Sequence, residues 1–137
     1  MHFEFKIEGG DFTRAGNASS EVKKILKQLN VEFKIIKRIV VALYEAEVNI
    51  VAHAFSGKIY VDIDKDKILL KLVDEGPGIA DIELAMKEGF STASQAVREM
   101  GFGAGMGLPN IKRNVDDFKI SSEVNKGTTL NLMCKLN

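Results

Sequence analysis

The sequence has one cysteine, Cys134, no tryptophan and no excess of either charge. A single thiol cannot form an intrachain disulfide, which favours a reducing compartment, so we expect a cytoplasmic protein. Because 19 basic and 19 acidic side chains cancel, the chain lacks the basic excess typical of general nucleic-acid binders. No apolar run approaches the roughly 18 residues of a membrane span, and the charged, alternating N-terminus is not a signal peptide.

Length and periodicity predict one α+β domain over residues 1–137. Alternating patterns predict strands at 2–8, 58–64, 67–74, 117–123 and 128–136. Helical patterns predict a helix with a capping-type start from about Asn17, a long helix at 31–55, a short helix at 81–87 and a helix that begins near Pro109. We expect a two-layer sandwich, in which helices cover one face of a mixed, mostly antiparallel sheet.

The long helix carries a polar line beside its apolar stripe. Glu45, Asn49 and His53 are four residues apart and therefore lie on one face of the helix. A solvated helix edge has this pattern, but a carboxylate can also accept a proton and an amide oxygen can ligate Mg²⁺. Glu47 lies nearer the apolar stripe, and the pattern assigns it no role.

A glycine-rich turn follows the second of the two central strands, in the order Asp74, Gly76 and Gly78. A surface turn uses the same residue types. Alternatively, an Asp at the end of a buried strand can accept a hydrogen bond from an exocyclic amine, while the glycines let a flat ring lie against the backbone.

The segment GFGAGMGLPN, residues 101–110, has glycine at every second position up to Gly107. It fits neither the Walker spacing nor the dinucleotide-binding spacing. The alternatives are a hinge, or a loop whose backbone amides bind anions where it enters a helix. A later segment, KGTTL, enters the last strand, where threonines are ordinary.

Together, and in this order, YEAEVNIVAH, DEGPGI, GFGAGMGLPNIKR and KGTTL resemble the boxes of the GHKL (Bergerat-fold) ATPases over about residues 31–136. Among these, the chain is similar to the small anti-sigma-type serine-protein kinases. The runs DEGPGIADIELAMKEGFSTA and GMGLPNIKRNVDDFKI resemble their switch-kinase branch. Three residues depart from the pattern: Gly101 is an extra glycine, and Tyr44 and Glu47 stand where these kinases more often have small or apolar residues. We hypothesise that Glu47 alters the pKa of Glu45 or crowds the site.

The resemblance implies a role for each matching residue. Glu45 would act as general base, and Asn49 would ligate the Mg²⁺ that bridges the phosphates. Asp74 would bind the adenine amino group, Thr128 would support the adenine through a hydrogen bond with water, and residues 90–101 would form a lid. The other implied nucleotide-binding residues are Gly76, Gly78, Ile79, Ser91, Thr92, Gly103, Gly105, Met106, Gly107 and Leu108.

The implied function is an ATP-dependent serine/threonine protein kinase that acts on a small regulatory protein. A STAS-type anti-sigma antagonist is the expected partner, with a sigma factor or a phosphatase as other partner classes, and a homodimer fits the resemblance. The alternative is an ATP-gated binding module that sequesters or activates a regulator with little catalysis.

Two other ATPase classes fit the sequence less well. A histidine kinase needs a phosphoacceptor histidine on a dimerisation helix, whereas His2 lies on the first strand and His53 on the nucleotide-facing helix. A hydrolytic ATPase of the chaperone or topoisomerase type would need further domains to use the energy.

Overall fold

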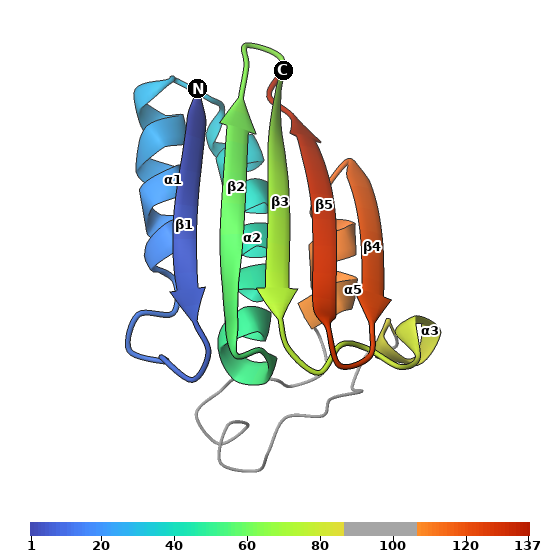
Figure 1. The fold of residues 1–137 in the computed structure, drawn as a ribbon. Helices are drawn as coiled ribbons and strands as arrows, with labels where there is room; N and C mark the ends of the chain where they lie inside the picture. The colour runs from blue at the N-terminus through green and yellow to red at the C-terminus, as the bar shows by residue number, and fades with distance from the viewer. Residues whose placement is uncertain (87–106) are drawn as a thin grey trace.

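The computed structural model describes residues 1–86 and 107–137. In this part of the chain, helices cover one face of a five-stranded sheet whose strand order is β1-β2-β3-β5-β4 (Figure 1). Each neighbouring pair of strands is antiparallel. The predicted two-layer α+β architecture is confirmed, and the sheet is antiparallel throughout the described residues rather than mixed.

The predicted helices and strands are all present. The strands are β1 (His2–Glu8), β2 (Ser56–Ile63), β3 (Lys67–Glu75), β4 (Asp117–Glu123) and β5 (Gly127–Lys135). The helices are α1 (Asn17–Gln28), α2 (Phe33–His53), α3 (Ile82–Ala85) and α5 (Gly107–Arg113). Within the described ranges, none of the helices is both long enough and apolar enough to cross a membrane.

Two boundaries differ from the sequence expectation because long-range pairing decides them. The long helix ends at His53, since Ala54 is extended. Ser56, which the sequence assigns to a helix stop, is the first residue of β2, where it pairs with both Glu8 and Glu75.

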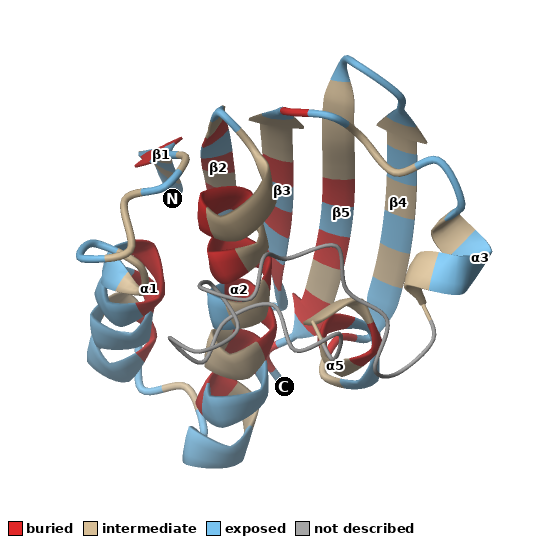
Figure 2. Cartoon of the chain, turned by 90° about the horizontal axis from the view of Figure 1, so that it is seen from below, coloured by how far each residue is buried: buried red, intermediate tan, exposed pale blue. Residues whose placement is uncertain are grey.

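The core lies between the sheet and α2. Alternate residues of β2 and β3 are buried, as expected for a sheet with one covered face. They meet the apolar stripe of α2, in which Ile39 and Leu43 are fully buried. α1 and α5 lie on either side of α2 (Figure 2). Each fully buried aliphatic side chain contributes about 1.5–3 kcal/mol, and Cys134 is one of the packing residues of this core.

The strand register brings distant segments to one end of the sheet. Val73 of β3 pairs with Thr129 of β5, so the next residues, Asp74 and Thr128, face each other on the helix-covered side. The C-terminal end of α2 and the start of α5 lie at this same end (Figure 1).

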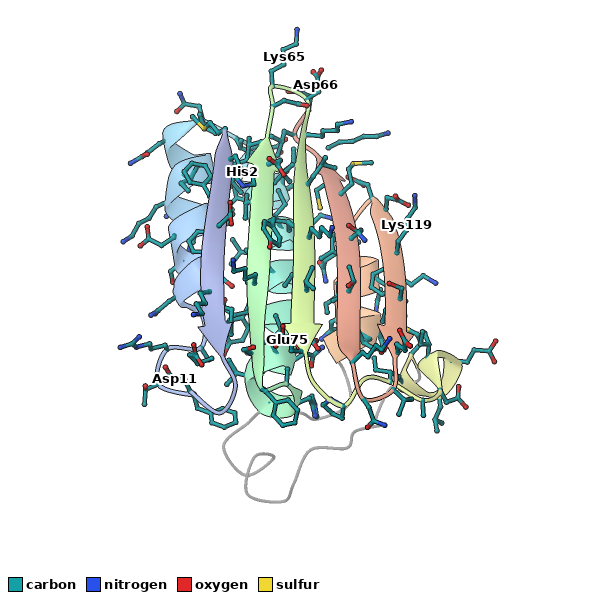
Figure 3. The ribbon with its side chains drawn as sticks, in the orientation of Figure 1. His2, Asp11, Lys65, Asp66, Glu75 and Lys119 are labelled. Atoms are coloured by element: carbon teal, nitrogen blue, oxygen red, sulfur yellow. The ribbon has the colours of Figure 1, made fainter. Side chains whose placement is uncertain are left out.

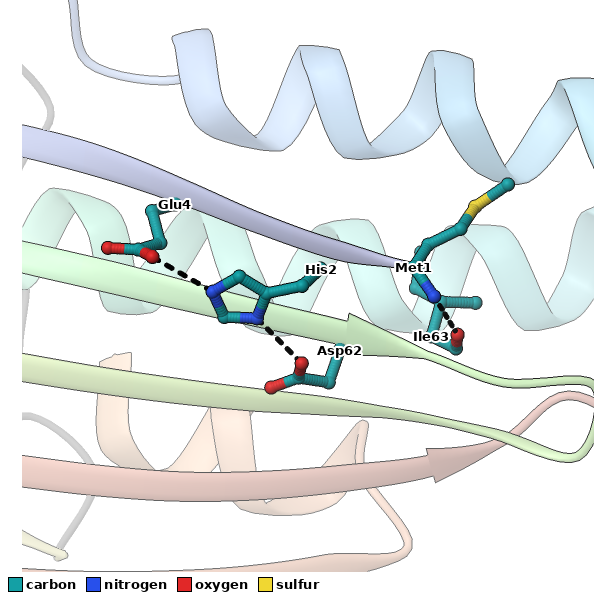
Figure 4. A network of polar contacts seen from close by, with 5 residues as sticks. All are labelled: Met1, His2, Glu4, Asp62 and Ile63. Atoms are coloured by element: carbon teal, nitrogen blue, oxygen red, sulfur yellow. Dashed lines mark hydrogen bonds and ion pairs between the residues drawn. The ribbon is translucent and has the colours of Figure 1, made fainter.

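The uncovered face of the sheet carries polar side chains (Figure 3). At its edge His2 bridges two strands: its Nδ1 lies 2.6 Å from Asp62 Oδ1 and its Nε2 lies 2.9 Å from Glu4 Oε2 (Figure 4). The Met1 amino group donates to the Ile63 carbonyl at 2.9 Å. The hydrogen bonds to Asp62 and then Glu4 raise the pKa of His2 above its ordinary 6.5.

This network predicts a pH-dependent contribution to stability. Because the folded-state pKa of His2 is raised, its contribution is fully present below the unfolded-state pKa near 6.5 and is lost as the pH rises through the folded-state value. We expect His2→Gln to flatten the fall in the free energy of unfolding with increasing pH over this window, measured by urea denaturation. Identical pH slopes for the variant and the wild type would contradict the assignment.

Candidate functional site

Asp74 and Thr128 form the first part of the site at the shared end of β3 and β5. The Thr128 backbone N–H donates to Asp74 Oδ1 at 3.1 Å. Burial raises the pKa of Asp74, and the bond from Thr128 opposes this effect. A carboxylate has about four acceptor sites, so Asp74 can accept a further hydrogen bond from an exocyclic amine. The structure thus brings together the two residues that the sequence placed 54 positions apart.

Ser122 of β4 completes this corner and was missed from the sequence. Its Oγ accepts a hydrogen bond from the Ile79 N–H at 2.7 Å and lies 2.9 Å from Thr128 Oγ1. It also donates to the Gly127 carbonyl at 3.1 Å. A serine in an alternating strand carries no signal of such a role, because the Ile79 N–H that it accepts from lies in a loop 43 residues away.

The loop after β3 needs glycine because it packs directly against other backbone. Gly78 has a φ of 73°, and a Cβ there would lie 2.3 Å from the Glu123 carbonyl oxygen. A Cβ on Gly76 would lie 2.9 Å from the Ala54 Cα at the end of α2. From the sequence, we expected these glycines to let the flat adenine ring lie against the backbone. The structure supplies an independent packing reason, and their contact with adenine stays a prediction.

Glu45 and Asn49 form the second part of the site on one face of α2. Both side chains are half-buried, and burial raises the pKa of Glu45. Asn49 lies against the first residue of α5, since a Cβ on Gly107 would lie 2.9 Å from Asn49 Oδ1. A side chain at position 107 would therefore have to displace the Asn49 amide, whose oxygen could ligate a cation.

His53 is the third member of the polar line. Burial lowers its pKa below the ordinary 6.5, so the imidazole is neutral near pH 7. The prediction that His53 is not a phosphoacceptor on a dimerisation helix stays a prediction.

Glu47 has a role that the sequence did not suggest. Its side chain is fully buried and accepts hydrogen bonds from three backbone amides, those of Gly16, Ala18 and Ser19, at 3.0–3.2 Å. The Ser19 hydroxyl donates to it at 2.7 Å. Glu47 therefore caps the N-terminus of α1, where a carboxylate is favourable.

The hypothesis that Glu47 perturbs Glu45 is wrong. Two residues along an α-helix are about 200° apart, so Glu47 faces α1 while Glu45 faces the site. Burial is what raises the pKa of Glu45. The expected local cap of α1 is also corrected: its N-cap is Gly16, which has no side-chain cap of its own.

The donor set fits a magnesium–nucleotide complex better than a dedicated metal site. The described residues contain no group of three or more His, Cys, Asp or Glu side chains that could hold a metal ion. Mg²⁺ in nucleotide sites takes few protein ligands and completes its shell with phosphates and water. A single amide oxygen from Asn49 suits that arrangement.

Part of the predicted nucleotide site lies outside the described residues. The described ranges exclude the predicted lid at residues 90–101 and five predicted ligands, Ser91, Thr92, Gly103, Gly105 and Met106. Leu108 is described, and it packs against the hydrophobic core.

The comparison with known families matches the histidine kinase-like ATPase domain over residues 11–134. The chain is 38% identical over 97 residues to the serine/threonine-protein kinase RsbT of Bacillus subtilis, covering 68% of this chain and 67% of the relative. It is 32% identical over 137 residues to the anti-sigma F factor of a Thermoanaerobacter species, covering 96% of this chain and 89% of the relative.

Solved structures share the fold. The RsbU and RsbW domains of Rv1364c from Mycobacterium tuberculosis superpose over 99% of this chain with a TM-score of 0.68 at 15% identity, and the chain spans 32% of that protein. The mycobacterial sensor histidine kinase MprB superposes over 98% of this chain and 97% of its own, with a TM-score of 0.56 at 16% identity.

These findings confirm the predicted fold and the predicted class, an ATP-dependent kinase of the anti-sigma type. The structure brings Asp74 and Thr128 together and places Glu45 and Asn49 on one face of α2, and their roles at a nucleotide site stay predictions. The chain belongs to the histidine kinase-like ATPase domain family.

Proposed function

We propose that this protein transfers the γ-phosphate of ATP to a serine or threonine of a small STAS-type regulatory protein. The observation that carries the proposal is Glu45, a half-buried carboxyl one helical turn from Asn49, in a chain whose relatives are named as a serine/threonine kinase and anti-sigma factors. A cytoplasmic location belongs to the proposal, because the chain has a single, buried cysteine and therefore no intrachain disulfide.

The two parts of the site would hold the two ends of ATP. Asp74 would accept a hydrogen bond from the adenine amino group, and its orientation is fixed by the Thr128 N–H. Asn49 would ligate Mg²⁺, which neutralises phosphate charge and aligns the phosphates when bound. Its amide lies next to the Gly107 backbone at the start of α5.

Glu45 would accept the proton of the acceptor hydroxyl. The hydroxyl oxygen forms a bond to the γ-phosphorus, the bond from that phosphorus to the β–γ bridging oxygen breaks, and ADP leaves. Burial raises the pKa of Glu45 toward the working pH, which makes the carboxylate a better base. Most of the rate would still come from positioning and charge stabilisation.

An ATP-gated binding module is the second candidate, favoured by the relatives that are named anti-sigma factors. In that case ATP would order the site, and the protein would hold a sigma factor or another regulator without phosphorylating it. Dimerisation stays a prediction in both cases. Label transferred to a partner serine or threonine supports the kinase, whereas ATP-dependent complex formation without transfer supports the module.

The general-base role predicts the behaviour of Glu45→Gln. With radiolabelled ATP, Mg²⁺ and the purified STAS-type domains of the same genome, we expect transfer to fall by about 10²–10⁴-fold, because the amide cannot take the proton. ATP affinity, measured by calorimetry, should stay within about twofold. Transfer at the wild-type rate would rule out Glu45 as the base.

The adenine-binding role predicts a selective loss in Asp74→Asn. Removing the charge weakens a charge-assisted hydrogen bond, so ATP affinity should fall by about 10–100-fold. GTP, which lacks an amino group at the matching ring position, should bind weakly to both proteins. If the variant binds ATP as the wild type does, Asp74 does not recognise adenine.

The contact between Asn49 and Gly107 predicts a magnesium-dependent effect of Gly107→Ala. The added Cβ would lie 2.9 Å from Asn49 Oδ1 and displace the amide. We expect ATP affinity to fall several-fold in Mg²⁺ and much less in EDTA. An equal loss under both conditions would show that the substitution acts on the phosphates or the fold, not on the metal ligand.

A further inference from the structure

Gly16 lies between two side chains of α2, Tyr44 and Glu47. The Gly16 N–H donates to Glu47 Oε2 at 3.0 Å. A Cβ on Gly16 would lie 3.2 Å from Tyr44 Cε1, so the tyrosine ring packs closely on this residue. The φ of Gly16 is +98°, in the left-handed region that favours glycine. Its position is therefore fixed from both sides.

The loop that ends at Gly16 is anchored at its other end as well. The Gly9 and Gly10 N–H groups donate to the carbonyls of Phe55 and Val51, both at 2.8 Å. Asp11 in this loop lies at the same end of the molecule as Glu75, the neighbour of Asp74 (Figure 3). The loop is thus a fixed part of the site end of the domain.

Tyr44 stands at the boundary between α1 and the catalytic face of α2. Adjacent helical residues are about 100° apart, so Tyr44 lies beside Glu45 on the side that faces α1. Its side chain is 39% exposed, although it packs on Gly16. Exposed tyrosines are strongly enriched among the residues that dominate protein–protein binding. A protein that brings a hydroxyl to Glu45 from this side meets the Tyr44 ring.

Two of the three positions at which the sequence departs from the kinase pattern, Tyr44 and Glu47, therefore contact the same glycine. The carboxylate of Glu47 holds Gly16 and the first turn of α1 through four hydrogen bonds. Gly16 in turn limits the positions that the tyrosine ring can take. Glu47 and Tyr44 are therefore linked through Gly16, and of these two side chains only Tyr44 is exposed.

We propose that Tyr44 contacts the protein that carries the acceptor hydroxyl, and that Glu47 is a positioning residue that fixes Tyr44 through Gly16. The inference rests on the proposed kinase function and identifies a determinant of protein-substrate specificity beside the general base. The nucleotide contacts of the site do not depend on it.

Steady-state transfer to the STAS-type domain that the wild type labels tests the role of Tyr44. We expect Tyr44→Ala to raise KM for that domain about tenfold, while ATP affinity stays within twofold. Glu47→Gln should do the same, because its amide NH₂ group cannot accept hydrogen bonds from the α1 backbone. If Glu47→Gln does not fold, Ser19→Ala is the variant to test in its place, because it removes the hydroxyl that donates to Glu47 at 2.7 Å.

Leu26→Ala is the matched control. Leu26 lies on α1 and is fully buried, so its truncation destabilises the same helix without touching the Glu47 cap. We expect a lower melting temperature and an unchanged KM for the protein substrate. If Leu26→Ala raises KM as much as Glu47→Gln at equal stability, Glu47 is merely structural and the proposal is overturned.

Tyrosine fluorescence tests the positioning without a partner. The chain has two tyrosines and no tryptophan, so Tyr60→Phe leaves Tyr44 as the only strong fluorophore. In that background, Glu47→Gln should increase acrylamide quenching of Tyr44, and Leu26→Ala should not. Equal quenching with and without the Glu47 carboxylate would overturn the positioning role.

The outcomes separate this inference from the function on which it rests. If the wild type labels no STAS-type domain, the proposed function fails and the inference fails with it. If the wild type transfers phosphate but Tyr44→Ala leaves KM unchanged, only the inference is overturned.

Discussion

The register between β3 and β5 is the constraint on which the rest of the site depends. These strands join the first half of the chain to the last, and their pairing sets Val73 opposite Thr129. Because side chains alternate along a strand, a slip of one residue would turn the buried leucines of both strands outward. It would also separate Asp74 from Thr128. The hydrophobic pattern that secures the core therefore also keeps Asp74 next to Thr128.

α2 uses three of its faces for three different purposes. One stripe packs on the sheet, and a second face carries Glu45 and Asn49. On a third face, Glu47 accepts the hydrogen bonds that hold the N-terminus of α1. We expect the face that carries Glu45 and Asn49 to be held in place, because the other two faces are packed against the sheet and α1. A helix held in this way can place a carboxyl and an amide with little freedom, as a site that works by positioning requires.

The sequence predicted those features whose signal is local. Period-two and helical patterns were sufficient for the strands and helices. The roles of Glu45, Asn49 and Asp74 come from the family resemblance and stay predictions, although the structure does bring Asp74 next to Thr128. Ser122 and Glu47 could not be placed in this way, because Ser122 joins a loop 43 residues away through Ile79 and the partners of Glu47 lie about 30 residues away. The start of β2 at Ser56 was missed for a similar reason, since pairing with β1 and β3 overrides the local helix-stop signal.

The cap of α1 has a consequence for how the chain folds. The helix begins at a glycine without a side-chain cap and has no acidic residue in its first turn. Its N-terminal amides find their acceptor in a residue of the next helix, so an isolated α1 segment would lack the group that starts it. Helix nucleation is costly, and α1 should therefore become ordered only after α2 has docked on the sheet. The first helix of the sequence would then be among the later ones to form.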